Sequence, residues 1–187
     1  MLLSVVACGI QAQSATPTPP PTSTPIPSLT LEALKNAEYD SEFPKDHKAK
    51  LTDGKYQEEY QPGAATKLII QLYPAYATGD VNGDGVDDAA VILVANPGGS
   101  GTFYHLAVVV NQGGTPKHVA SQSLGDRIIV KSISIKSGEI VLNMTVHGPN
   151  DPLCCPTLEV TRTYKLQEDT LVQLSRTNGR GLDLLQS

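Results

Sequence analysis

Residues 132–146 read SISIKSGEIVLNMTV, and this stretch indicates the fold. Apolar side chains alternate with polar ones on both sides of Ser137-Gly138, which is the period of a strand with one buried face. A Ser-Gly pair between two such runs marks a tight turn. We therefore expect a β-hairpin whose buried face carries Ile133, Ile135, Ile140, Leu142 and Met144.

Similar apolar or alternating runs occupy most of the chain and are separated by turn residues. They are residues 67–73, 88–96, 103–111, 118–124, 127–136, 139–147, 158–166 and 171–174. Strands at this short spacing predict an antiparallel meander. Residues 90–96 (AVILVAN) and 106–111 (LAVVVN) are apolar at consecutive positions, which predicts central strands covered on both faces.

The expected fold is therefore mainly β, with a minor α component. We predict an antiparallel meander sheet, strongly twisted or partly closed into a barrel. Leu31 and Leu34 lie on one helical face behind Thr30, which predicts a short N-terminal helix with Thr30 as its cap. No sequence period repeats along the chain, so a β-propeller is excluded.

The domain organisation follows from changes in composition. The chain has 187 residues, which is ordinary for one folded domain. Residues 14–28 (SATPTPPPTSTPIPS) are rich in Pro, Thr and Ser and predict an extended stalk. We expect an anchor segment at 1–13, the stalk at 14–28, a β-rich globular domain at 29–175 and a flexible tail at 176–187.

The charge and the aromatic content of the sequence restrict the classes of binding partner that we expect. The net charge is −5 and the 14 basic residues form no cluster, so we expect no nucleic-acid partner. Tryptophan is absent and seven tyrosines are the main aromatic residues, so broad stacking platforms for sugars are few. An unknown protein or glycan is left as the expected partner.

The N-terminal residues MLLSVVACGIQAQ contain a short apolar stretch that runs into Cys8. Residues 5–8 (VVAC) resemble the lipobox of bacterial lipoproteins. The resemblance implies that Cys8 is lipidated and becomes the first mature residue, which would anchor the chain to a membrane. A stalk directly after such an anchor fits a domain held outside the cytoplasm. An unstructured apolar tail is the alternative.

Residues 79–93 read GDVNGDGVDDAAVIL and carry four aspartates around two glycines. Calcium takes six to eight oxygen ligands, and a loop can present them at alternate positions while glycine permits the sharp turn. The side chains of Asp80, Asn82, Asp84 and Asp88 and the carbonyl of Val86 occupy such positions. Val91 stands where an EF-hand has its bidentate glutamate, so the loop is not an EF-hand.

The same loop resembles the calcium loop of FG-GAP and VCBS-type repeats. That resemblance covers about fifteen residues and implies that Asp80, Asn82, Asp84 and Asp88 bind calcium through side chains and Val86 through its carbonyl. Asp87 is expected to face solvent or a neighbouring residue. The alternative is an ordinary Asn/Asp/Gly turn without an ion.

Residues 147–157 (HGPNDPLCCPT) contain adjacent cysteines, Cys154 and Cys155. Outside the cytoplasm they can pair only with each other if Cys8 is lipidated. Three interpretations stay open: a strained vicinal disulfide, two buried thiols, or a soft-metal or redox site that includes His147.

No phosphate-binding loop, nucleophile elbow or HExxH motif occurs in the sequence. Six short motifs occur along the chain: GDVNGDG (79–85), GGSGTFY (98–104), LGDR (124–127), HGPNDP (147–152), CCPT (154–157) and TRTYKL (161–166). With these motifs, most of residues 29–174 resembles uncharacterised bacterial secreted proteins and lipoproteins, which implies the cell envelope but no activity. The leading hypothesis is a lipid-anchored, calcium-stabilised binding or structural module of a bacterial envelope. The alternatives are a thiol redox or soft-metal protein that uses the paired cysteines, and a hydrolase whose site the sequence does not reveal.

Overall fold

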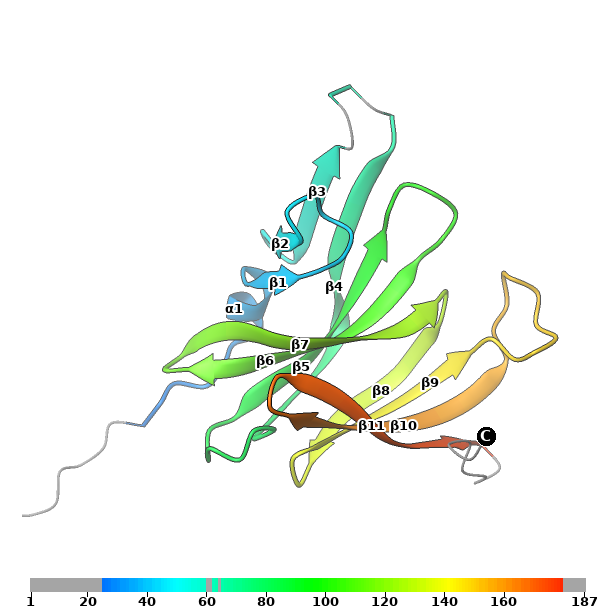
Figure 1. The fold of residues 1–187 in the computed structure, drawn as a ribbon. Helices are drawn as coiled ribbons and strands as arrows, with labels where there is room; N and C mark the ends of the chain where they lie inside the picture. The colour runs from blue at the N-terminus through cyan, green and yellow to red at the C-terminus, as the bar shows by residue number, and fades with distance from the viewer. Residues whose placement is uncertain (1–24, 60–61, 64, 180–187) are drawn as a thin grey trace, which may run out of the picture.

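The computed structural model describes residues 25–59, 62–63 and 65–179 (Figure 1). Cys8, the predicted anchor segment and most of the predicted stalk lie outside these residues. The elements in chain order are α1 (Leu31–Lys35), β1 (Glu38–Asp40), β2 (Lys48–Lys50), β3 (Lys55–Glu59), β4 (Lys67–Gly79), β5 (Asp88–Asn96), β6 (Phe103–Gln112), β7 (Thr115–Asp126), β8 (Ile129–Lys136), β9 (Glu139–Val146), β10 (Leu158–Gln167) and β11 (Thr170–Asn178).

The predicted mainly β, antiparallel fold is confirmed. The strands form a five-stranded sheet in the order β3-β4-β5-β6-β7, a four-stranded sheet in the order β11-β10-β9-β8, and the two-stranded ribbon β1-β2. Strands that are consecutive in the chain pair within each of the larger sheets, so each is a meander. Figure 1 shows the strong twist of the strands, and one sheet curls into a half-barrel. The strands therefore divide between sheets instead of forming one.

Two apolar cores lie on opposite faces of the five-stranded sheet. One fills the space between the two larger sheets and includes Ile92, Leu106 and Leu142. The other lies under α1 and the β1-β2 ribbon and includes Leu34, Tyr39 and Val91. Alternate residues of β5 and β6 thus enter different cores, which explains why residues 89–95 and 106–110 are apolar at consecutive positions.

The hairpin of residues 132–146 forms as predicted. Ile133 lies opposite Leu142 and Ile135 opposite Ile140, so these side chains share one face. Ile140, Leu142 and Met144 are fully buried, and the two isoleucines of β8 pack against the same core. Positive φ angles at Ser137 and Gly138 form the turn.

The N-terminal helix also agrees with the sequence. Thr30 caps α1, because its hydroxyl accepts a hydrogen bond from the backbone N–H of Ala33 at 3.1 Å. The Tyr39 hydroxyl donates to the carbonyl of Leu34 at 2.9 Å, which joins the helix to β1. Within the described residues, no helix is long and apolar enough to span a membrane.

Several element boundaries differ from the sequence prediction. β4 continues past Pro74 to Gly79 because the pairing with β5 is interrupted between Leu72 and Tyr76, where proline costs no ladder hydrogen bond. The short strands β1 and β2 were not predicted. β11 extends beyond residue 175 to Asn178, which pairs with Val160, so residues 176–178 belong to the sheet.

Asn111 of β6 connects the end of the predicted stalk to the rest of the domain. Its side-chain amide donates to the carbonyl of Pro27 at 2.9 Å and to that of Asp87 at 3.3 Å. Its side-chain oxygen accepts from the backbone N–H of Gly114 at 2.7 Å. Leu29 is buried in the core under α1. The chain is therefore fixed to the β6-β7 hairpin from Pro27 onward.

Candidate functional site

The acidic loop of residues 80–87 connects β4 to β5 and lies where the two larger sheets meet. A Cβ atom added to Gly138, in the β8-β9 turn, would lie 3.7 Å from the carbonyl oxygen of Asp80. A shallow hollow beside the loop is lined by residues of β4, the loop, the β8-β9 turn and β10, including Asp80, Asn82 and Lys165. The loop therefore contacts both sheets.

Backbone amides orient the exposed side chains of the loop. The carboxylate of Asp80 accepts from the N–H groups of Gly83 at 2.6 Å and Gly85 at 3.0 Å. These hydrogen bonds lower the pKa of Asp80 below its usual range. Asp84 accepts from the N–H of Val86 at 2.8 Å, and the side-chain amide of Asn82 donates to Asp84 at 3.0 Å.

Asp88 lies beneath the loop at the start of β5 and is fully buried. One carboxylate oxygen accepts from the N–H of Val81 at 3.2 Å and the other from the N–H of Asn111 at 2.9 Å. Burial is the main cause of the raised pKa of Asp88, and the negative charges of Asp84 and Asp80 raise it further. Three carboxylates therefore lie within electrostatic range of one another.

The donor set of this loop fits a hard cation, because it consists of carboxylate, carboxamide and carbonyl oxygens. Within the described part of the chain, no Lys, Arg or His forms an ion pair with Asp80, Asp84 or Asp88. In the same residues, no three His, Cys, Asp or Glu side chains converge as a metal site would require. The structure thus brings the predicted ligands into one loop, oriented mainly toward backbone amides, and Asp87 is exposed.

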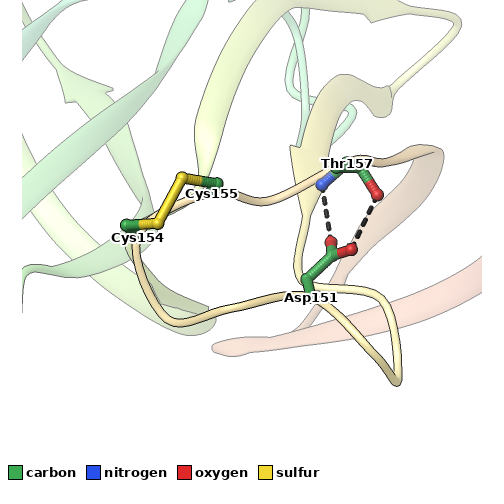
Figure 2. The surroundings of a disulfide bond; sticks show 4 residues. All are labelled: Asp151, Cys154, Cys155 and Thr157. Atoms are coloured by element: carbon green, nitrogen blue, oxygen red, sulfur yellow. Dashed lines mark hydrogen bonds between the residues drawn. A yellow bond between two sulfur atoms is a disulfide. The ribbon is translucent and has the colours of Figure 1, made fainter.

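The predicted vicinal disulfide is present in the exposed loop between β9 and β10 (Figure 2). Cys154 and Cys155 are bonded, with Cα atoms 3.8 Å apart. Asp151 closes the loop, because its carboxylate accepts from the N–H of Thr157 at 2.7 Å and the Thr157 hydroxyl at 2.8 Å. Leu153 beside the disulfide is 72% exposed. The alternative of buried thiols is therefore wrong for this structure, since both cysteines are exposed.

We expect the disulfide to be accessible but to add little stability. Bonding two adjacent residues closes almost no chain, so the denatured state loses little entropy. In a Cys8→Ser background, which removes the third cysteine of the chain, reduction should expose two thiols to a thiol-reactive dye in the folded protein and change the free energy of unfolding by less than about 1 kcal/mol. Cys154→Ser/Cys155→Ser should behave like the reduced protein. Thiols that titrate without reductant would instead favour the soft-metal or redox alternative.

A cleft of about 560 Å³ lies outside the acidic loop, between the β1-β2 ribbon and β6-β7. Its floor is apolar and includes Ile70 and Leu93, while Asp40, Glu42, His105, His118 and Ser121 are among its polar lining residues. A cavity of this size, with polar side chains around an apolar floor, suits a small ligand. Sequence reasoning missed this cleft because its walls come from strands and turns that are distant in the chain.

His118 and Ser121 are brought onto one face of β7 by a β-bulge. Val109 pairs with His118 and Val108 with Ala120, so Val119 is the extra residue. The Nε2 atom of His118 lies 2.9 Å from the Oγ atom of Ser121, and Asp40 lies at the other side of the ring. Burial lowers the pKa of His118 despite the neighbouring carboxylate of Asp40.

The tautomer of His118 bears on the hydrolase alternative. The backbone N–H of Asp40 donates to Nδ1 of His118 at 3.2 Å, and the Asp40 carboxylate lies 3.4 Å from the same atom. The backbone donor favours the tautomer whose proton is on Nε2, where it faces Ser121. A histidine that activates a serine must accept the serine proton at the nitrogen facing the hydroxyl, which is Nε2 here. This geometry therefore favours a binding role for the cleft over nucleophilic catalysis by Ser121.

No protein-family model matches this chain, and no curated protein or solved structure is significantly similar to it.

Proposed function

We propose that this protein is a calcium-stabilised binding module, tethered outside the cytoplasm of a bacterial cell. The single observation that supports it best is the acidic loop. Several carboxylates lie together there without a basic partner among the described residues, and Asp88 joins the base of the loop to β6. A bound cation would offset the repulsion between these carboxylates and fix the loop across both sheets.

The other parts of the proposal rest on separate features. The cleft between the β1-β2 ribbon and β6-β7 provides a place for the ligand of a binding module. The stalk and the lipid anchor at Cys8 remain predictions from the sequence. The site lacks the bidentate glutamate of an EF-hand, so its affinity for calcium is expected to be modest, on the order of millimolar to micromolar.

We expect calcium to raise the melting temperature of the full chain relative to a chelated sample, because an ion that binds only the folded state stabilises it by mass action. At calcium one hundred times above its dissociation constant, the gain is about 2.7 kcal/mol. Asp84→Ala should lose this gain, because it removes an exposed predicted ligand. Thermal unfolding followed by circular dichroism measures both effects.

Asp87→Ala is the matched control, since Asp87 is exposed in the same loop but its side chain is not a predicted ligand. It should keep the full response to calcium. If calcium leaves the wild-type melting temperature unchanged, or if D84A and D87A respond equally, the acidic loop is an ordinary turn. Magnesium at the same concentration tests selectivity, and a smaller response is expected because Mg²⁺ demands stricter octahedral geometry.

A further inference from the structure

Two arginines face each other on the inner side of the four-stranded sheet. Arg162 of β10 lies directly opposite Arg176 of β11. Arg162 alternates with the buried residues Val160 and Tyr164, so both guanidinium groups start from the face that packs toward the five-stranded sheet. Both side chains are half-buried.

Neither arginine has an acidic partner among the described residues. The Nε atoms of both are buried and form no hydrogen bond with the part of the chain that the structure describes, and the same holds for the hydroxyl of Tyr164. Among the described residues, the one hydrogen bond of either guanidinium is a long one, from Arg162 to the carbonyl of Leu124 at 3.4 Å. Burial, followed by the positive charge of Arg162, lowers the pKa of Arg176.

Two neighbouring guanidinium groups with unused donors are energetically unfavourable unless another group neutralises their charge. Like charges at directly opposed positions of a sheet repel each other, and buried donors without acceptors cost about 1–3 kcal/mol each. Two described carboxylates of β7 and β10 are already engaged, since Asp126 pairs with Arg127 and Glu159 with Lys131. A guanidinium pair with unused donors matches the acceptor oxygens of an oxyanion, which it can bind in a bidentate manner.

We propose that Arg162 and Arg176, with the hydroxyl of Tyr164, form a binding site for a phosphate or sulfate group. The anion neutralises the pair and accepts from donors that the described residues leave unused. The site lies between β10-β11 and β7, which is beside β11. The site uses none of the residues of the acidic loop or of the cleft that His105 and His118 line, here called the histidine cleft. Anion binding therefore does not depend on calcium.

The test is isothermal titration calorimetry of the full chain with inorganic phosphate and with sulfate, in chloride buffer of constant ionic strength. Wild-type protein should bind phosphate, and Arg162→Gln and Arg176→Gln should each weaken binding by about tenfold or more, since each removes charge-assisted hydrogen bonds. Arg127→Gln is the matched control, because Arg127 already pairs with Asp126. It should bind phosphate as the wild type does.

Arg176→Lys covers the case in which a glutamine variant does not fold. It keeps the charge but loses the planar fork, so binding should weaken by about threefold to tenfold. Sedimentation with phosphatidylglycerol and phosphatidylcholine vesicles distinguishes a lipid headgroup from a free anion. Binding to phosphatidylglycerol that R176Q abolishes supports a headgroup as the carrier. The proposal would be overturned if phosphate and chloride gave equal heats and no vesicle binding were seen. It would also be overturned if R127Q lost as much phosphate affinity as R162Q and R176Q.

Discussion

Asp88→Ala is expected to lower the free energy of unfolding by about 3–5 kcal/mol, measured by urea unfolding in the presence of a chelator. The carboxylate accepts from the backbone N–H groups of Val81 and Asn111, and all three residues are buried. Alanine leaves both N–H groups without an acceptor and without access to water. Relief of repulsion from Asp80 and Asp84 offsets only a small part of this cost, because Asp84 is exposed and Asp80 is only half-buried, so solvent screens both charges.

Two comparisons sharpen this prediction. Asp87→Ala changes the adjacent exposed side chain and should alter stability by no more than about 0.5 kcal/mol. Asp88→Asn keeps one acceptor oxygen but turns an amide donor toward the other N–H group. Its loss of unfolding free energy should therefore lie between those of D87A and D88A. The chelator removes any contribution from a bound ion, so the measured difference belongs to the protein alone. Similar stability of D88A and D87A would contradict the assigned role of Asp88.

Gly79→Ala is expected to cost about 2–3 kcal/mol. A Cβ atom at this position would lie 2.8 Å from Cγ2 of Ile135, well inside van der Waals contact. Gly79 ends β4 and Ile135 lies in β8, so the close approach occurs between the two larger sheets. Neither strand can move aside without disturbing its hydrogen-bonded neighbour. Chemical denaturation of the variant measures the loss.

Gly99→Ala controls for the loss of a glycine, because a Cβ atom there meets nothing within 4 Å. That variant should lie within about 0.5 kcal/mol of the wild type. A double-mutant cycle with Ile135→Ala isolates the contact, since a smaller side chain in β8 leaves room for the added methyl group. G79A should then cost much less than in the wild-type background. If G79A lowered the free energy of unfolding equally in both backgrounds, its effect would not come from contact with Ile135.

The larger strands could be predicted from the sequence because their apolar period is strong and their turns carry Gly, Asn or Asp. The same reasoning missed β1 and β2, which contain only three residues each and bury only Tyr39 and Ala49. Division of the strands into separate sheets was also not predictable. It depends on the change of direction near Arg127, where a positive φ angle turns the chain between β7 and β8.

The candidate sites show a similar division. The acidic loop and the cysteine pair are local in sequence, so their residues could be named in advance. The histidine cleft and the arginine pair depend on cross-strand register and a β-bulge. Neither register nor a bulge could be predicted from the sequence pattern. His118 and Ser121, for example, share a face only because Val119 interrupts the ladder.

The hydrogen bonds of Asn111 have a mechanical consequence if residues 14–28 form the stalk that the sequence predicts. A pulling force applied along residues 14–28 would enter the folded domain at Pro27, whose carbonyl is held by Asn111. Asn111 also holds the backbone of Asp87 and the carboxylate of Asp88. The load would therefore pass directly into the base of the acidic loop, and the proposed ion would stiffen the point where the predicted stalk joins the domain.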